Sequence, residues 1–341
     1  MSSALGTRLG GVGRWLPGLL ISIVAIGLLL WLADREELSQ AIREMDIRGL
    51  APAIIFYILG IAFRALSWMT LLQNKAPYRR VFVTLNEGYL LNNIFPFRLG
   101  ELGRVLLLSQ SAQLSPFFVL STIILERAYD VVLAAGLLLA TLPLVLGFEY
   151  ATPAAWTALG FVLAGLIALF FLAKNRGGIK TKLENVAIKN VFFRQRVFLR
   201  LDSFLDGLGV LIHPIQFFLS LLFMTASWLF GVLEIHTLLN QGDAQVPIWW
   251  TGFALGVVSL GIAIPSAPAG LGVYEAAMVG ALTLLGYPAG KALAVAIVAH
   301  LIHISFTGIV GGIGLLREGQ TITGLYNRLR NSTRLNTSSQ I

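Results

Sequence analysis

The sequence contains no cysteine, and only 12% of its 341 residues are charged. The absence of cysteine excludes a disulfide framework, a thiol nucleophile and a metal site with cysteine ligands. Soluble globular domains carry roughly a quarter charged residues, so the low charge excludes a soluble enzyme. The hydrophobic share of 56% and the mean hydropathy of +0.79 instead predict an all-α polytopic integral membrane protein.

Long apolar runs divide the chain into membrane segments, because a helix needs roughly 20 apolar residues to cross a bilayer. The runs cover residues 16–33, 49–73, 117–147, 153–173, 215–239 and 289–316. Two further regions, 81–110 and 248–286, are apolar but interrupted by proline and glycine. We therefore expect about eight transmembrane segments in one domain over residues 1–316, followed by a cytoplasmic tail at 317–341.

Lysine and arginine are concentrated in some connections and absent from others. Residues 74–80, 174–213 and the C-terminal tail are basic, whereas residues 147–152 and 240–246 contain no lysine or arginine. The positive-inside rule places the basic connections and both termini in the cytoplasm, in a protein of the cytoplasmic membrane. Membrane topology thus explains the net charge of +8, and no nucleic-acid partner is expected.

The basic segment 174–213 also contains apolar side chains between its arginines. This pattern favours either an amphipathic helix on the cytoplasmic lipid surface or a solvated loop.

This orientation constrains the broken region 81–110. Residues 74–80 and 174–213 lie on the same side, and two full spans separate them. The region must therefore leave on the side from which it entered, or cross twice as two short segments. A re-entrant helix pair that turns at Pro96 fits, because broken backbone is tolerated in a bilayer where it is buried in protein or lines a wet cavity. Region 248–286 can be interpreted in the same way, although the number of membrane crossings around it does not require this.

Charged side chains inside membrane segments are costly and mark functional sites by default. Arg98, Glu101 and Arg104 follow Pro96 at intervals of three residues, along one side of a predicted helix. Glu101 can pair with either arginine, which leaves positive charge over. A guanidinium group beside a helix N-terminus suits a phosphate, because it binds two phosphate oxygens at once. The alternative is a structural network of ion pairs at the cytoplasmic interface.

The span that follows carries charges of both signs. Glu126 and Asp130 share one helix face, and Arg127 can reach Asp130. The carboxylates either balance the arginines, bind a coupling cation or relay protons. The predicted substrate-binding group is Arg98, Glu101, Arg104, Glu126, Arg127 and Asp130.

Further polar and helix-breaking residues are predicted to line or gate a cavity. They are Arg64, Glu87, Asn92, Asn93, Pro265, Pro268, Gly270, Gly272 and Glu275. The two broken regions have weakly similar sequences. In transporters, a pair of broken helices, one in each half of the chain, indicates the substrate site near the middle of the membrane. His300 and His303 share a helix face without an evident carboxylate, so they are expected to pack, and neither a metal nor a cofactor is expected. Glu234 is expected to have no special role.

Three motifs together resemble a known family. They read Pro96-Phe97-Arg98-x-Gly100-Glu101-x-x-Arg104, then Glu126-Arg127-x-x-Asp130, then Pro265-x-x-Pro268-x-Gly270-x-Gly272-x-x-Glu275. This set is similar to the lysylphosphatidylglycerol synthase transmembrane family, also called flippase-like. In its best-known members this membrane region accompanies a cytoplasmic aminoacyl-transferase domain and translocates the aminoacylated phospholipid. The sequence stops shortly after its last predicted span, so we expect that transferase to be absent.

The leading functional hypothesis is translocation of a lipid with an anionic phospholipid or polyprenyl-phosphate-linked headgroup, without an enzymatic activity. One alternative is a polyprenyl-phosphate-dependent glycosyltransferase or its accessory, for which Asp34-x-Glu36 is the only candidate acidic pair. Another is a non-transporting membrane partner of a separate lipid-modifying enzyme, recruited through the basic segment. Membrane lipids are the expected partners in the leading hypothesis.

Overall fold

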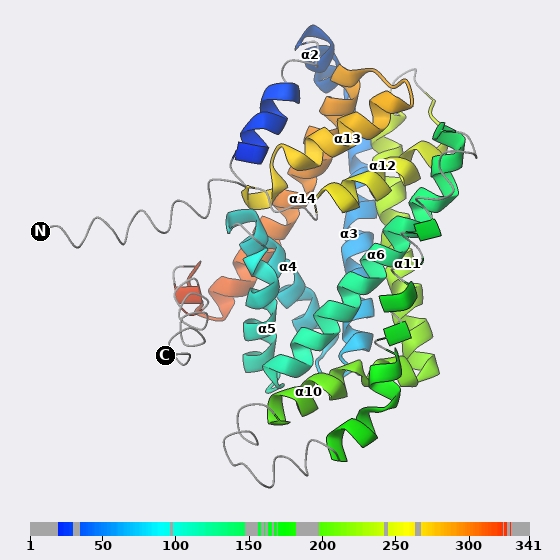
Figure 1. Cartoon of the computed structure of the whole chain (residues 1–341). Coiled ribbons are helices and arrows are strands. Elements are labelled where there is room, and N and C mark those ends of the chain that lie inside the picture. The colour runs from blue at the N-terminus through cyan, green and yellow to red at the C-terminus, as the bar shows by residue number, and fades with distance from the viewer. Residues whose placement is uncertain are drawn as a thin grey trace, which may run out of the picture.

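The computed structural model describes residues 20–29, 35–95, 98–146, 198–241, 245–262 and 267–322, together with parts of 156–181 and residues 324, 325 and 328. Every regular element in these ranges is a helix (Figure 1). Within the described ranges, four helices are long and apolar enough to cross a membrane: α3 (Ile47–Leu71), α6 (Pro116–Leu146), α11 (Pro214–Leu239) and α14 (Ala289–Arg317). They confirm four of the predicted spans as long apolar helices.

The other two predicted spans are described only in part. Residues 20–29 of the first run form a short apolar helix. Residues 153–173 contain helical pieces separated by residues that lie outside the described ranges. The predicted total of about eight segments therefore remains a prediction.

The first broken region forms a helical hairpin. It consists of α4 (Tyr78–Ile94) and α5 (Leu99–Ser111), each shorter than a full span. Arg80 Nε donates to Ser111 Oγ at 2.7 Å, so the start of α4 lies beside the end of α5. The chain thus returns to the end from which it came, as the parity of the basic connections predicts. Pro96, the predicted turn residue, lies outside the described residues, and α5 begins after Arg98.

The second broken region folds in the same way. It consists of α12 (Ile248–Gly261), a short 3₁₀ helix (Pro268–Gly270) and α13 (Val273–Leu284). The rings of Trp250, at the start of α12, and Tyr287, just after α13, lie 6.4 Å apart. This region is therefore also a hairpin that returns to its starting end.

The two hairpins enter the molecule from opposite ends, because the helices that precede them run antiparallel. The backbone N–H of Asp46, before α3, donates to Gln241 Oε1, just beyond α11, at 3.1 Å. At the other end of the pair, Ser67 Oγ donates to the carbonyl oxygen of Ser220 at 2.8 Å. The segments α3–α6 and α11–α14 therefore share one order, long helix, hairpin, long helix, in inverted orientation (Figure 1). Such inverted repeats are typical of transporter folds.

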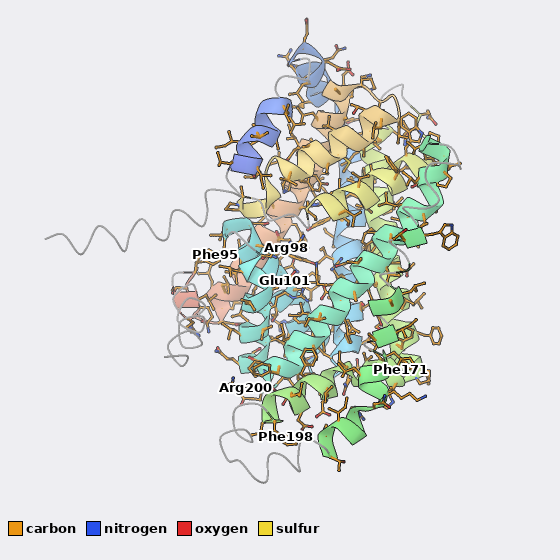
Figure 2. The ribbon with its side chains drawn as sticks, viewed as in Figure 1. Phe95, Arg98, Glu101, Phe171, Phe198 and Arg200 are labelled. Carbon is orange, nitrogen blue, oxygen red and sulfur yellow. The ribbon has the colours of Figure 1, made fainter. Side chains whose placement is uncertain are left out.

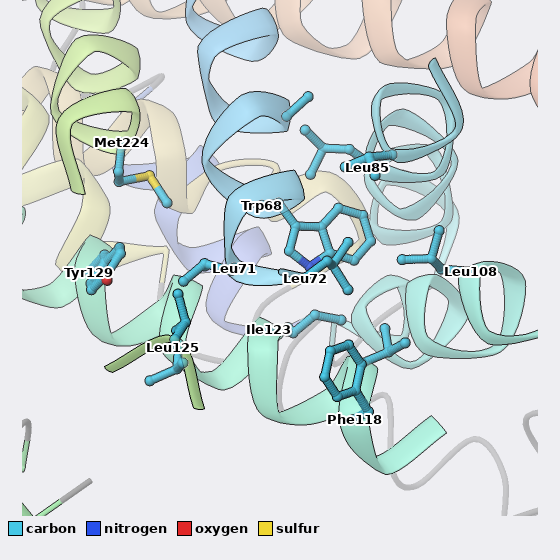
Figure 3. Packing of buried hydrophobic residues seen from close by; sticks show 14 of the residues in the cluster. Trp68, Leu71, Leu72, Leu85, Leu108, Phe118, Ile123, Leu125, Tyr129 and Met224 are labelled. Atoms are coloured by element: carbon cyan, nitrogen blue, oxygen red, sulfur yellow. The ribbon is translucent and has the colours of Figure 1, made fainter. Parts of the chain in front are cut away.

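A buried cluster fixes the first hairpin between α3 and α6 (Figure 3). Trp68 of α3 is fully buried among Leu85 of α4, Leu108 of α5 and Phe118 of α6. Its indole N–H donates to Thr122 Oγ1 at 3.1 Å, which satisfies the one polar atom of the ring. Side chains of α3 and α6 therefore hold the hairpin in place.

In the basic segment 174–213, residues 201–212 pack against protein, whereas most of the described residues at 174–181 are exposed. Helix α10 (Leu199–Gly207) lies on α6, and its Leu205 is fully buried in the same cluster. Lys180 lies 2.6 Å from Asp202 and 2.9 Å from Asp206. The apolar residues of this segment predicted to contact lipid are Val191, Phe192, Phe198, Leu199, Leu201 and Phe204. Phe198 is buried, Leu201 and Phe204 pack partly buried against the same cluster, and Leu199 is exposed. The prediction of a lipid-facing surface is thus wrong for Phe198, which is buried in the protein. Residues 182–197 lie outside the described ranges.

Glycine permits the close approach of α4 and α5, and this can be tested. A Cβ at Gly100 would collide with the backbone carbonyl oxygen of Gly88, which cannot move without displacing α4. We expect Gly100→Ala to destabilise the protein by about 1–3 kcal/mol, as an overpacked contact. Gly136→Ala, on α6, meets nothing within 4 Å and is the matched control. Thermal unfolding in detergent should show a lower midpoint for Gly100→Ala only; equal midpoints would contradict the close contact.

Candidate functional site

The tips of the two hairpins meet beside a cavity of about 680 Å³. Arg98, at the tip of the first hairpin, donates from Nη2 to the carbonyl oxygen of Ile262, at the tip of the second, at 2.7 Å. Figure 2 shows Arg98 and Glu101 near this meeting point, far from Phe198 and Arg200 beside α10. A cavity of several hundred Å³ is the size in which proteins bind small molecules and headgroups.

Several predicted residues line this cavity from both repeats. They are Arg64, Asn92, Asn93, Arg98, Glu101, Arg127, Asp130 and Gly270. Asn93 also donates from Nδ2 to Thr307 Oγ1 of α14 at 3.0 Å, which ties the first hairpin to the second repeat. The structure thus brings the two broken regions together at one polar space.

Arg64 and Arg127 are held in the cavity wall by carboxylates of α6. Arg64 of α3 pairs with Asp130, and its Nε lies 3.1 Å from Glu126 Oε1. Arg127 Nη1 lies 3.1 Å from Asp130, as the spacing predicts, and its Nε lies 3.6 Å from Glu101 of α5. Asp130 also accepts from the indole N–H of Trp228 at 3.1 Å. These contacts fix both guanidinium groups from several helices.

Arg104 and Glu126 lie behind the wall and do not line the cavity. Glu126 is 0% exposed, and its two oxygens accept from Arg104 Nη1 at 3.2 Å and Nη2 at 2.5 Å. The Arg104 guanidinium also lies 3.9 Å from the centroid of the Trp68 ring, a cation–π contact. The prediction that Arg104 holds a headgroup is therefore corrected, because its fork is already occupied by a carboxylate.

Other residues predicted to line the cavity instead make contacts elsewhere in the protein. Glu87 is fully buried in α4 on the side facing Gly314 of α14, with Arg80 Nη2 at 3.7 Å. Gly272 has a φ of 82° and caps α13, where its N–H donates to Glu275 Oε2 at 2.7 Å. Pro268 begins the 3₁₀ helix of the second hairpin. None of these side chains lines the cavity, and Pro265 lies outside the described residues.

One positive charge is left over on the α3–α6 side. Four arginines, at positions 64, 98, 104 and 127, face three carboxylates, at positions 101, 126 and 130. Arg98 forms no ion pair with any residue in the described ranges, and its guanidinium lines the cavity. An arginine in this position can bind two oxygens of a phosphate.

Two histidine–glutamate pairs occupy the opposite side and contradict the expectation that the histidines lack carboxylates. His303 Nε2 lies 2.8 Å from Glu234 Oε1, and His300 Nδ1 lies 2.5 Å from Glu275 Oε1. His300, His303 and Glu234 all line the cavity. Glu234 therefore has a specific partner, contrary to prediction. Within the described part of the chain, no group of three or more such side chains could hold a metal ion.

The inverted repeat relates these pairs to the arginine pairs. Arg64–Asp130 joins the first and last helices of one repeat, as Glu234–His303 does in the other. Glu101 and Glu275 both stand at the third position of α5 and α13, and each pairs with the following long helix, through Arg127 and His300. One sequence signal could have revealed the histidine–glutamate pairs. The two histidines, His300 and His303, have the same spacing of three residues as Arg127 and Asp130.

Comparison with known proteins agrees with this architecture. The lysylphosphatidylglycerol synthase TM region matches residues 15–311. The chain belongs to this membrane family. It is also 26% identical over 120 residues to a UPF0104 membrane protein of Pyrococcus horikoshii, a match that covers 33% of this chain. The aligned part spans about a third, 36%, of that relative. Family membership confirms the resemblance carried by the three motifs.

Proposed function

We propose that this chain translocates lipids with an anionic headgroup, and that the cavity between the hairpin tips binds that headgroup. The observation that carries the proposal is Arg98, a cavity-lining arginine without a carboxylate partner in the described ranges. The inverted repeat supports transport, because two oppositely oriented halves around one site can expose that site alternately to either side. Family membership is consistent with a membrane function of this kind.

In this proposal the protein lies in the cytoplasmic membrane with both termini in the cytoplasm. The headgroup, an anionic phospholipid or a polyprenyl-phosphate-linked group, enters the cavity while its acyl chains stay in the bilayer. Asp130 and Glu101 keep the arginines in place without neutralising Arg98. The protein moves the lipid without changing it covalently, so any enzyme that modifies the lipid is a separate partner.

Purified protein in liposomes tests the proposal directly. Vesicles containing a trace of fluorescent phosphatidylglycerol are treated with dithionite, which reaches only outer-leaflet headgroups. We expect the protected inner-leaflet fraction to be bleached much faster with protein than without it. Fluorescent phosphatidylcholine, which has no net negative charge, is the matched lipid control and should move more slowly.

Each result decides the proposal. No acceleration for phosphatidylglycerol or for a fluorescent polyprenyl phosphate would overturn it. Equal rates for the anionic and zwitterionic lipids would overturn the assignment of Arg98 as a headgroup ligand, because the charge would then play no part. A faster rate for anionic lipids would support the proposal and would also separate it from the two alternatives, a glycosyltransferase and a non-transporting partner.

A further inference from the structure

The two sides of the cavity differ in one chemical respect. On the α3–α6 side, Arg64 and Arg127 carry permanent positive charges. At the related positions of the inverted repeat stand Glu234 and two histidines, whose charge depends on protonation. The cavity therefore combines one fixed charged wall with one titratable wall.

Both ring nitrogens of His300 already have hydrogen-bond partners. Its Nε2 lies 3.0 Å from the carbonyl oxygen of Ala269, which can only accept, so Nε2 carries a hydrogen. Its Nδ1 lies 2.5 Å from Glu275 Oε1, and this short contact requires a second hydrogen on either the imidazole or the carboxyl group. The pair thus already holds its proton and is electrically neutral.

His303 has different surroundings. Its side chain is 28% exposed towards the cavity, whereas that of Glu234 is only 3% exposed. Its Nε2 contacts Glu234, and its other ring nitrogen has no hydrogen-bond partner among the described residues. This ring nitrogen is therefore available to a proton from the cavity, and the buried Glu234 carboxylate lies against the other ring nitrogen.

Several helices contribute groups around His303, and α4, which packs against α14, adds Tyr89 and Asn93 to the same cavity. Glu234 comes from α11, Tyr57 of α3 stacks at 4.3 Å between ring centroids, and Tyr274 of α13 stands edge-on at 5.9 Å. His300 precedes it by one turn on α14, and Arg64 lines the same cavity. Glu234 is thus the one carboxylate in direct contact with His303 in the described ranges.

The charges of the cavity then depend on this single proton. With His303 neutral, the excess charge of Arg98 is cancelled by Glu234, and the ionisable groups of the site sum to zero. With His303 protonated, the site carries one positive charge, which matches a monoanionic phosphate diester. Binding of that anion and binding of the proton must therefore favour each other, because linkage is reciprocal.

We propose that His303 and Glu234 form a proton-binding site that makes uptake of an anionic lipid headgroup depend on protonation. His303 takes one proton from water when the headgroup enters the cavity and returns it when the headgroup leaves. No other bond is made or broken. This inference rests on the proposed function, which identifies the anion as a lipid headgroup. It adds that one proton is transported together with each lipid.

The first experiment measures transport under a pH gradient. Proteoliposomes with fluorescent phosphatidylglycerol are prepared with the outer solution more acidic or more alkaline than the lumen. We expect net movement of the lipid away from the acidic side, with rates that differ severalfold between the two gradients. His303→Gln should remove this difference, while His236→Gln, which removes a histidine of α11 that does not line the cavity, should keep it.

The second experiment measures the proton without transport. Detergent-solubilised protein in weakly buffered solution is mixed with short-chain phosphatidylglycerol, and a pH-indicator dye reports proton uptake. Wild type should take up on the order of one proton per bound anion, and short-chain phosphatidylcholine should cause none. Glu234→Gln keeps the volume of the side chain and provides a second variant if His303→Gln does not fold. Because it leaves one positive charge without a proton on His303, it should bind the anion with little proton uptake.

The two experiments separate this inference from the proposed function. Transport with neither a response to the gradient nor proton uptake would overturn the inference and leave the function standing. Proton uptake in wild type but not in His303→Gln, with no transport, would support the proton site and overturn translocation. A gradient response that persists in His303→Gln would overturn the assignment to His303.

Discussion

Replacement of Glu126 by glutamine is expected to remove most of the folded protein. Glu126 is fully buried and contacts three guanidinium groups, those of Arg64, Arg104 and Arg127. Arg104 is itself almost completely buried, so the variant leaves a charge in the interior without its counter-ion. Removing one partner of a buried ion pair costs about 3–5 kcal/mol, a large part of the stability of most proteins.

Glu101→Gln is the matched control, because it makes the same chemical change in a part-exposed carboxylate. Glu101 contacts Arg127 at 3.6 Å, and Arg127 keeps its contacts with Glu126 and Asp130 when that contact is lost. Partly exposed pairs contribute roughly 1 kcal/mol or less. Thermal unfolding and the monodisperse yield in detergent should therefore fall sharply for Glu126→Gln and little for Glu101→Gln. Similar stability of the two variants would show that the buried carboxylate does not hold the cluster together.

Arg98 variants are expected to lose transport while keeping the fold. The side chain lines the cavity, and its one hydrogen bond to a described residue runs to the backbone of the other hairpin. Arg98→Gln removes the leftover positive charge, and we expect flipping of phosphatidylglycerol to fall about tenfold or more, the effect of losing a charged hydrogen-bonded contact of some 1.5–3 kcal/mol. Arg98→Lys should restore only part of the rate, because lysine keeps the charge but cannot bind two phosphate oxygens in a planar fork.

Arg104→Gln serves as the opposite control. Arg104 is enclosed between Glu126 and the Trp68 ring, so its loss should lower folded yield rather than the rate per folded protein. The flipping rates of the Arg98 and Arg104 variants must therefore be compared at matched amounts of folded protein. Wild-type flipping by Arg98→Lys and Arg98→Gln would remove Arg98 from the binding site. A normal yield of Arg104→Gln would contradict its structural role.

Sequence patterns predicted much of the fold. Apolar run length located the four long helices, and the parity of basic connections predicted that residues 81–110 return to their starting side. The i,i+3 spacing also placed Arg127 beside Asp130. These features follow from local rules, because run length, charge asymmetry and helical periodicity are properties of a single segment.

The tertiary structure alone distinguished the roles of similar residues. Arg98 and Arg104 are equivalent in the sequence, yet one lines the cavity and the other is sealed behind Glu126. The histidines of α14 gained carboxylate partners from α11 and α13, which lie 69 and 25 residues away from them in the chain. Such contacts depend on how helices pack, and no local pattern encodes them.

The sequence by itself thus determined that this is a helical membrane protein, where its long helices lie and which segments are broken. Burial in a bilayer imposes those features on each segment separately, since every backbone polar group must be satisfied within it. Only the tertiary structure decided that the two hairpins meet tip to tip, that Arg98 at their junction has no ion-pair partner among the described residues, and that histidine–glutamate pairs lie across the cavity. Those outcomes depend on the antiparallel packing of α3 against α11, which brings together side chains from both halves of the chain.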